Sequence, residues 1–87
     1  WDGRWRIIIY DVPNKKSKNR LAFAEKLKTL GFVMIQKSVW AYPFECYKEL
    51  LILRKFYGIE RHVTYLEAVE VEDELDWRGK FNLKFQS

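Results

Sequence analysis

The sequence predicts an α+β fold with the element order βαββαβ, a four-stranded antiparallel sheet and two helices on one of its faces. An apolar run near the N-terminus is closed by a proline, as at the end of a strand. Two later segments place apolar residues at helical spacing and are each followed by a glycine. Three further β-rich segments lie between and after them. A chain of 87 residues is long enough for one small domain, which we place over residues 1–87.

The first predicted strand covers residues 4–12 and is apolar on both faces. It alternates Trp5, Ile7 and Ile9 with Ile8, Tyr10 and Val12. A strand of this kind lies in the centre of a sheet and is covered on both sides. Pro13 ends it because proline lacks a backbone N–H, and Asp11 is then its last polar residue.

A helix and a hairpin follow. Phe23, Leu27 and Leu30 recur at helical spacing and predict an amphipathic helix over about residues 16–30. Gly31 is its expected C-terminal cap, since glycine adopts the left-handed conformation without steric cost. The segment "FVMIQKSVWAY", residues 32–42, contains two β-rich runs around Gln36 to Ser38 and predicts strands two and three.

The second helix begins after Pro43 and ends before Gly58, with Cys46, Leu50 and Leu53 on its buried stripe. The segment "RHVTYLEAVEV", residues 61–71, alternates in the manner of a fourth strand. In so short a chain this order favours the ferredoxin-like architecture, a split βαβ unit.

Residues 70–87 form a C-terminal extension. We expect a short helix near Glu72 to Trp77, and a fifth strand in "KFNLKF", residues 80–85, that pairs with a sheet edge of its own or of a partner subunit. Two helices cover only one face of the sheet, yet the first strand is apolar on both. A second copy or another domain would cover the other face, so the sequence predicts a homodimer.

Composition excludes several classes of protein. One cysteine cannot close an intrachain disulfide, and one histidine makes no zinc site. No segment resembles a signal peptide or a membrane span, so we expect a cytoplasmic protein. The net charge of +4 hides a basic cluster of Lys15, Lys16, Lys18 and Arg20 and a later acidic segment. Such a cluster attracts phosphate or is a solvated helix face. The opening "WDGRWR" is typical of entry into a domain of a longer chain.

Asp11 is the main candidate for chemistry, and two interpretations stay open. It caps the turn or the first helix, or it is a ligand at the end of a strand. One carboxylate is a poor Mg²⁺ site, but a twofold axis near Asp11 would bring two together, and the ion would then activate water against a phosphodiester positioned by the lysines. Trp40 could stack on a base, although aromatic residues in such a domain are more often core or interface.

The segments "IIIYDVPNKKSKNRL" and "IQKSVWAYPFE" together resemble the CRISPR-associated Cas-two (Cas2) family, small dimeric ferredoxin-like proteins. They also resemble the related central domain of PaaX-like transcriptional repressors. The likeness spans residues 4 to about 69, and the entry Trp1-Asp2-Gly3 is closer to the PaaX-type context, in which a winged-helix DNA-binding domain precedes this one.

The resemblance implies that Asp11 matches the metal-binding aspartate, one from each protomer, and that Ser38 and Trp40 match the serine and the aromatic residue of the hairpin motif beside it. It also implies Mg²⁺, or Mn²⁺ in its place, and a nuclease or a role in spacer acquisition with adaptation partners. Family positions that are usually acidic or basic correspond here to Asn14, Lys15 and Ser17. Loss of a phosphate-binding arginine would weaken transition-state stabilisation, so the sequence leaves enzymatic activity open.

Three hypotheses follow for function. The first is a homodimeric nucleic-acid-associated domain with a Mg²⁺-dependent phosphodiester site that acts on RNA or DNA, with Asp11 and Ser38 as catalytic residues and Lys15, Lys16, Lys18, Arg20 and Trp40 as contacts to nucleic acid. The second is a non-catalytic dimerisation or regulatory domain of a PaaX-like repressor. The third is an interaction domain for a protein or a small effector.

Overall fold

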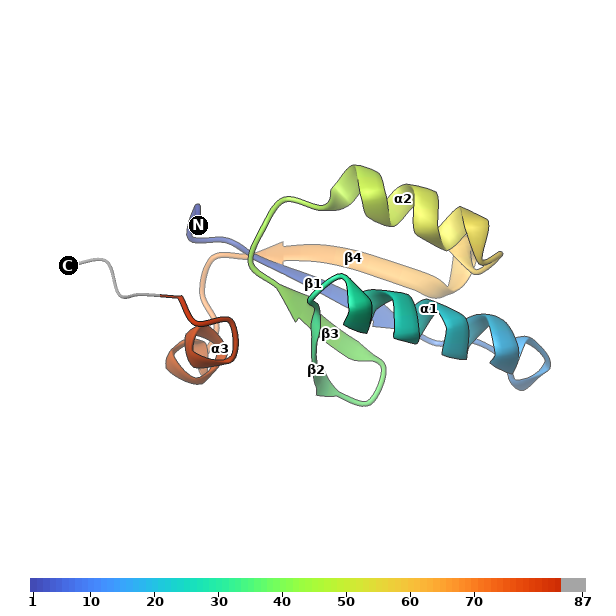
Figure 1. Cartoon of the computed structure of the whole chain (residues 1–87), viewed down its shortest axis with the longest axis horizontal. Coiled ribbons are helices and arrows are strands. Elements are labelled where there is room, and N and C mark those ends of the chain that lie inside the picture. Colours follow the sequence, from blue (N-terminus) through green and yellow to red (C-terminus); the bar gives the residue numbers. More distant parts are fainter. Residues whose placement is uncertain (84–87) are drawn as a thin grey trace.

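The structure, a computed structural model, describes residues 1–83 and confirms the predicted α+β fold. Its elements are β1 Trp5–Tyr10, the 3₁₀ helix η1 Asn14–Lys16, α1 Ser17–Thr29, β2 Val33–Gln36, β3 Val39–Tyr42, α2 Tyr47–Phe56, the 3₁₀ helix η2 Glu60–His62, β4 Val63–Ala68 and α3 Glu74–Lys80. The antiparallel sheet has the strand order β2-β3-β1-β4, so β1 is central, as its two apolar faces predict (Figure 1). The predicted strands at residues 4–12 and 61–71 are each shorter than expected.

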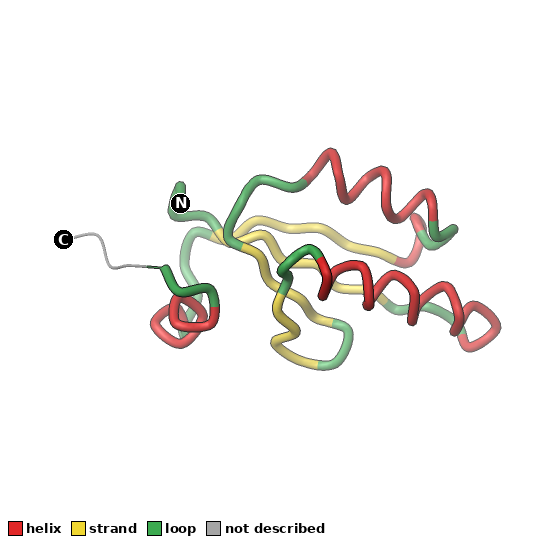
Figure 2. Tube along the Cα trace, viewed as in Figure 1, coloured by secondary structure: helices red, strands yellow, loops and turns green. Residues whose placement is uncertain are grey.

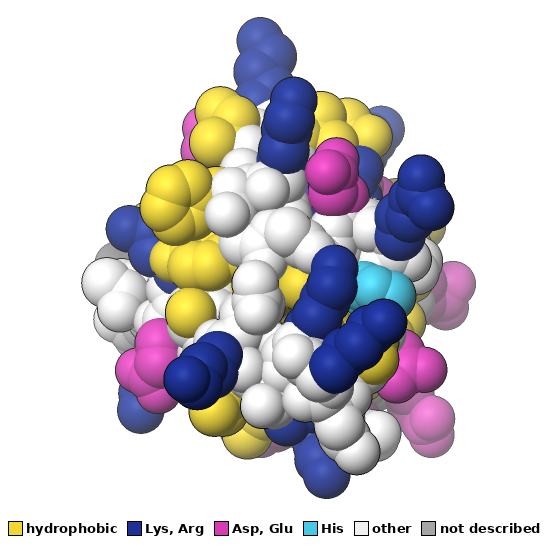
Figure 3. All heavy atoms as spheres, turned by 90° about the vertical axis from the view of Figure 1, so that its right-hand side faces the viewer, with side chains coloured by type: hydrophobic (Ala, Val, Ile, Leu, Met, Phe, Trp, Pro, Cys, Tyr) yellow, Lys and Arg dark blue, Asp and Glu magenta, His cyan; other side chains and the backbone are white. Residues whose placement is uncertain are grey.

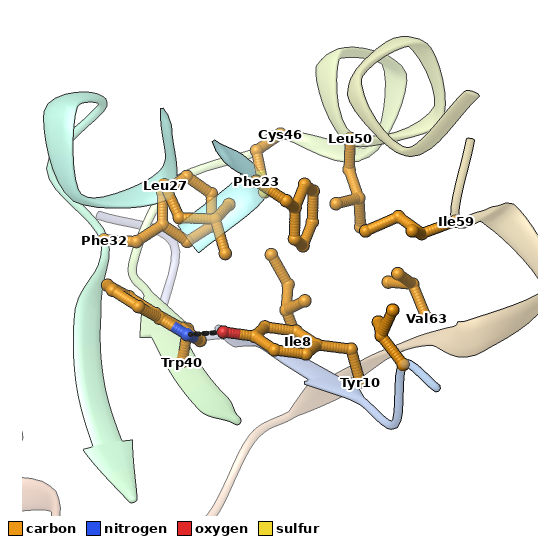
Figure 4. Packing of buried hydrophobic residues seen from close by; sticks show 11 residues of the cluster. Ile8, Tyr10, Phe23, Leu27, Phe32, Trp40, Cys46, Leu50, Ile59 and Val63 are labelled. Carbon is orange, nitrogen blue, oxygen red and sulfur yellow. Dashed lines mark hydrogen bonds between the residues drawn. The ribbon is translucent and has the colours of Figure 1, made fainter. Parts of the chain in front are cut away.

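Helices α1 and α2 cover one face of the sheet. Their residues Phe23, Leu27 and Leu50 pack on Ile8 and Tyr10 of β1, in a cluster that also contains Trp40 and Val63 (Figure 4). Because side chains alternate along a strand, Arg6 also lies on this face, and Trp5, Ile7 and Ile9 lie on the other. Gly31, at φ 99°, follows α1 and fulfils the predicted left-handed cap.

From two helices on one face, we expected the second face of the sheet to be uncovered by this chain. In the structure, part of it is covered. Helix α3 packs its buried Trp77 edge-on against Trp5, with ring centroids 5.3 Å apart, and Phe81 lies 5.8 Å from the same ring. The first strand is therefore apolar on its second face partly because the chain itself supplies a third helix there. Figure 2 shows α3 at the end of the sheet where the chain starts, far from the loop that joins β1 to α1.

The fifth strand predicted over residues 80–85 is wrong for its described part. Lys80 is the last residue of α3, and the chain then turns at Phe81 and Asn82. A spacing of four residues places Trp77 and Phe81 on one helical side, so the apolar residues here serve helix packing instead of strand alternation. Residues 84 and 85 lie outside the described residues. Within residues 1–83, no helix has both the length and the apolar character needed to cross a lipid bilayer.

Candidate nucleic-acid interface at the Asp11 end of the sheet

Asp11 lies one residue beyond β1 and is exposed. Its backbone N–H donates to the carbonyl of His62 at 2.9 Å, which continues the β1–β4 ladder by one hydrogen bond. Tyr10 and Val12 on either side of it belong to the core under the helices. Alternation therefore directs Asp11 to the opposite side of the strand, the side of Ile9.

Ser38 lies beside this strand end through its backbone. It forms the β2–β3 turn at φ 64°, a left-handed conformation that is unusual for a residue with a side chain, and its carbonyl accepts a hydrogen bond from the Tyr10 N–H at 3.1 Å. The structure thus brings the β2–β3 turn, the end of β1 and the start of β4 to one end of the sheet.

Trp40 is a core residue in this structure. Its side chain is 5 % exposed, and its indole N–H donates to the hydroxyl of Tyr10 at 3.0 Å (Figure 4). Such a hydrogen bond satisfies the polar ends of both rings inside the core. In this conformation the Trp40 ring has no open face on which a base could stack.

The side chains of Lys16 and Asn19 are hydrogen-bonded to the C-terminal end of α2. The Lys16 ammonium donates to the carbonyl of Gly58 at 2.8 Å, and the Asn19 amide donates to the carbonyl of Tyr57 at 2.9 Å. A cation at a helix C-terminus complements the helix dipole and satisfies a carbonyl that the helix leaves without a partner. Lys16 consequently has a structural role, which its position in a lysine run did not indicate. Lys15 and Lys18 are exposed, and Arg20 is half-buried on α1.

A small hollow of about 150 Å³ lies next to the hydrogen bond between Lys16 and Gly58. Lys16, Gly58, Glu60, Arg61 and His62 line it. Figure 3 shows Lys and Arg side chains gathered around the single histidine on this end of the molecule. Its lining carries two cationic side chains, Lys16 and Arg61, against one carboxylate, Glu60, so the hollow suits an anion better than a cation.

The sequence interpretation missed His62 as the neighbour of Asp11 and, with Arg61, as part of the hollow at this end. His62 has the appearance of an exposed residue at a strand start, and no local motif marks it. The signal was in the topology: in a βαββαβ fold the fourth strand pairs antiparallel with the first, so its start lies beside the end of the first strand.

The donor set around Asp11 does not fit Mg²⁺ within one chain. The described residues contain no group of three or more His, Cys, Asp or Glu side chains placed to hold a metal ion. Magnesium prefers oxygen ligands and commonly takes one or two carboxylates with substrate phosphates and water. A metal site here would need a second Asp11 from another copy.

A second charged cluster surrounds Arg6 at the opposite end of β1. Arg6 is buried, and its guanidinium donates to both carboxylate oxygens of Asp2, at 2.8 and 2.7 Å, and to the carbonyl of Pro43 at 3.0 Å. The hydrogen bonds from Arg6 and from the Arg4 backbone hold the pKa of Asp2 well below its usual range. In turn, the Asp2 carboxylate raises the pKa of Arg6. This bidentate pair fastens the segment before β1 to the sheet.

Comparison with known protein families identifies the family of this chain. The family described as the PaaX protein central Cas2-like domain matches residues 1–78 of the chain. A search among curated proteins finds no match.

Proposed function

The chain belongs to the family of PaaX protein central Cas2-like domains, and from this premise we propose that it is a nucleic-acid-associated regulatory module without hydrolytic activity. The observation that carries the proposal is the composition of the Asp11 end, where the exposed carboxylates of Asp11 and Glu60 are outnumbered by the cations Lys15, Lys16, Lys18 and Arg61. Such a surface can neutralise phosphates, but in a single chain it lacks the ligands of a metal site.

Electrostatics supports binding to the nucleic-acid backbone. The exposed Lys15 and Lys18 and the hollow with Lys16 and Arg61 all lie near the same end of the sheet. Each cation that neutralises a phosphate releases condensed counterions, so binding of this kind weakens steeply as salt rises. Contacts to phosphate position a protein and carry no sequence information, which suits a module whose neighbour reads the bases. We accordingly place the module in a cytoplasmic PaaX-like repressor whose winged-helix domain contacts the operator.

We further propose that the module is a homodimer. Helix α3 covers the Trp5 end of the second face, but Ile9 remains 39 % exposed towards the other end, and Leu66, opposite Ile7 in the middle of the sheet, remains 36 % exposed. Asp11 is directed to this same side of the sheet. Packing of two copies over Ile9 and Leu66 would therefore bury apolar surface and bring the two Asp11 residues towards each other.

The first prediction distinguishes phosphate binding from metal-dependent hydrolysis at Asp11. We expect the chain to bind a labelled DNA duplex at low salt, as measured by fluorescence anisotropy, with equal affinity in Mg²⁺ and in EDTA. Asp11→Asn removes a negative charge near phosphate, so it should leave the affinity unchanged or increase it about two- to fivefold. The double substitution Lys15→Gln with Lys18→Gln should reduce the slope of log K against log salt by about two.

The matched control replaces two exposed lysines elsewhere, Lys28→Gln with Lys48→Gln, and should leave the salt slope nearer to that of the unsubstituted chain. Cleavage of RNA or DNA that requires Mg²⁺ or Mn²⁺ and disappears in Asp11→Asn would overturn the non-catalytic proposal and establish the nuclease hypothesis. Absence of binding to any nucleic acid at low salt would instead favour an interaction domain for protein or a small effector.

A further inference from the structure

An apolar cavity lies at the opposite end of the core from Asp11. It has a volume of about 160 Å³ and lies between the C-terminal half of α1, the residues before β2 and the first turns of α2. Figure 4 shows Leu27 from α1, Phe32 from the approach to β2 and Cys46 from the approach to α2 around this part of the core. The cavity is thus bounded by elements that are distant in sequence and fixed by the fold.

The walls suit a flat apolar group. Leu27 and Leu50 form one part of the lining, and Phe32 and Tyr42 form another, with their rings stacked at 4.2 Å and 13° between planes. Burial raises the pKa of the Cys46 thiol to about 11, so this part of the wall is neutral at physiological pH. An apolar cavity of about 150 Å³ is known to hold one benzene molecule. One six-membered ring is therefore the size of occupant that this cavity accepts.

The charged side chains in the lining are both acidic. Glu45 and Glu49 lie at the start of α2, and no Lys or Arg is among the described residues that line the cavity. Glu45 is fixed in part by the N–H of Tyr47, which donates to its carboxylate at 2.9 Å, and lies 3.6 Å from Arg6. Glu49, in the first turn of α2, is exposed. An occupant that carries a positive charge would therefore be favoured over a neutral or anionic one of the same shape.

A shallower apolar groove continues from the cavity along the two helices. It shares Leu30, Glu49 and Leu53 with the cavity and adds Lys26 and Ile52, of which Ile52 is 68 % exposed. Lys26 lines only this outer groove and is not part of the cavity wall. Exposed apolar side chains beside a cavity are expected where a ligand extends beyond it. Packing of α2 on the sheet does not account for an apolar residue at the Ile52 position, because this side chain points away from the core.

We propose that this cavity binds a small primary amine with an apolar body about the size of one six-membered ring, placed between Leu27, Phe32 and Leu50, with its ammonium group towards Glu49. The site is independent of the function proposed above, because it lies away from Asp11 and its occupation can be measured without nucleic acid.

The test compares three ligands of nearly equal shape and different charge: benzylamine, benzyl alcohol and benzoate. Titrations of the 87-residue chain are followed at pH 7 by the amide chemical shifts of isotope-labelled protein. We expect saturable binding of benzylamine, with the largest shifts at Leu27, Leu53 and their neighbours, and about two- to fivefold weaker binding of benzyl alcohol. Benzoate should bind more weakly than the alcohol, because both carboxylates repel it.

Two variants and a control make the test specific. Glu49→Gln should bring the affinity for benzylamine close to that for benzyl alcohol and leave the alcohol unaffected, whereas Glu70→Gln, an exposed glutamate outside the lining, should change neither. Leu30→Trp, at a partly exposed position of the lining, should reduce the binding of both ligands at least tenfold, and a thermal melt confirms that the variant is folded. The proposal is overturned if no ligand saturates, if the three bind equally, if benzoate binds best, or if the shifts map elsewhere.

Discussion

At the scale of single residues, Arg6 illustrates how a charge is accommodated in an apolar layer. It lies on the same face of β1 as the core residues Ile8 and Tyr10, and only 2 % of it is exposed. Burial of a guanidinium is unfavourable unless its donors are satisfied and its charge is paired. Asp2 and the Pro43 carbonyl accept its hydrogen bonds, and Glu67 lies 3.8 Å from its Nε.

A prediction about pH follows from this pair. The folded state lowers the pKa of Asp2, so the pair stabilises the fold fully above the unfolded-state pKa of about 4 and loses this contribution as pH falls through the lower folded-state value. We expect Asp2→Asn to lower the melting temperature at pH 7 and to lose less further stability on acidification from pH 5 to pH 2 than the unsubstituted chain. Thermal melts by circular dichroism at several pH values measure both effects.

The control for this prediction is Asp11→Asn, the same chemical change at an exposed site away from Arg6. It should follow the pH dependence of the unsubstituted chain more closely. Parallel acid profiles for Asp2→Asn and the unsubstituted chain would show that the pair with Arg6 does not contribute to acid stability.

At the scale of elements, α3 explains why the second face of the sheet is apolar near Trp5. Trp77 of this helix is buried, whereas Leu75 on the same helix is 67 % exposed. Contacts of large aromatic rings dominate such small interfaces, since each buries a large apolar area. The helix is short, so its stability depends on this packing more than on its own hydrogen bonds.

The substitution Trp77→Ala should therefore release α3 from the sheet. We expect it to lower the free energy of unfolding by about 3 to 5 kcal/mol, as for other buried aromatic residues replaced by alanine. Leu75→Ala, a truncation on the exposed side of the helix, should change it by less than about 0.5 kcal/mol. Urea denaturation of both variants provides the comparison, and equal effects would mean that α3 contributes little to the fold.

The sequence predicted the βαββαβ elements but not the position of the third helix. The alternation in "KFNLKF" resembles a strand, but Phe81 and Leu83, the apolar residues of its described part, follow the end of a helix and pack against the cluster that contains Trp77. Local pattern cannot choose between these two, because the choice depends on the apolar face of the sheet that is available nearby. For a similar reason, the sequence could not decide whether Trp40 is buried. The register of the hairpin determines which face of the sheet a residue occupies, and local pattern does not fix this register.

At the scale of the whole molecule, the two ends of the sheet differ in chemistry. The Asp11 end carries an excess of cations and the uncovered residue Ile9, whereas the other end is closed by α3 (Figure 1). Asp11 itself could be placed at a strand end from local pattern alone, whereas its neighbour His62 follows only from the pairing of the first and fourth strands, which the predicted topology implies.

Association of two chains through the second face of the sheet can be tested by substitution. Ile9→Lys places a charge in the uncovered part of the sheet face, so we expect it to shift the chain from dimer to monomer in sedimentation velocity at micromolar concentration. Leu21→Lys introduces the same charge at an exposed apolar position of α1 and should leave the dimer intact. A monomeric unsubstituted chain at high concentration, or equal effects of both variants, would contradict association through this face.

The hydrogen bond between Lys16 and Gly58 affects how the Asp11 end of the sheet would bind an anion. A lysine side chain loses roughly 1.5 to 2 kcal/mol of conformational freedom when it becomes ordered. The Lys16 ammonium is already held by one carbonyl, and an ammonium group has three N–H donors, so two remain for a phosphate. Much of the ordering has taken place during folding, and Lys16 is in this sense a preorganised cation. A phosphate that reaches it would lose less binding free energy to side-chain ordering than one that contacts the exposed Lys15 or Lys18.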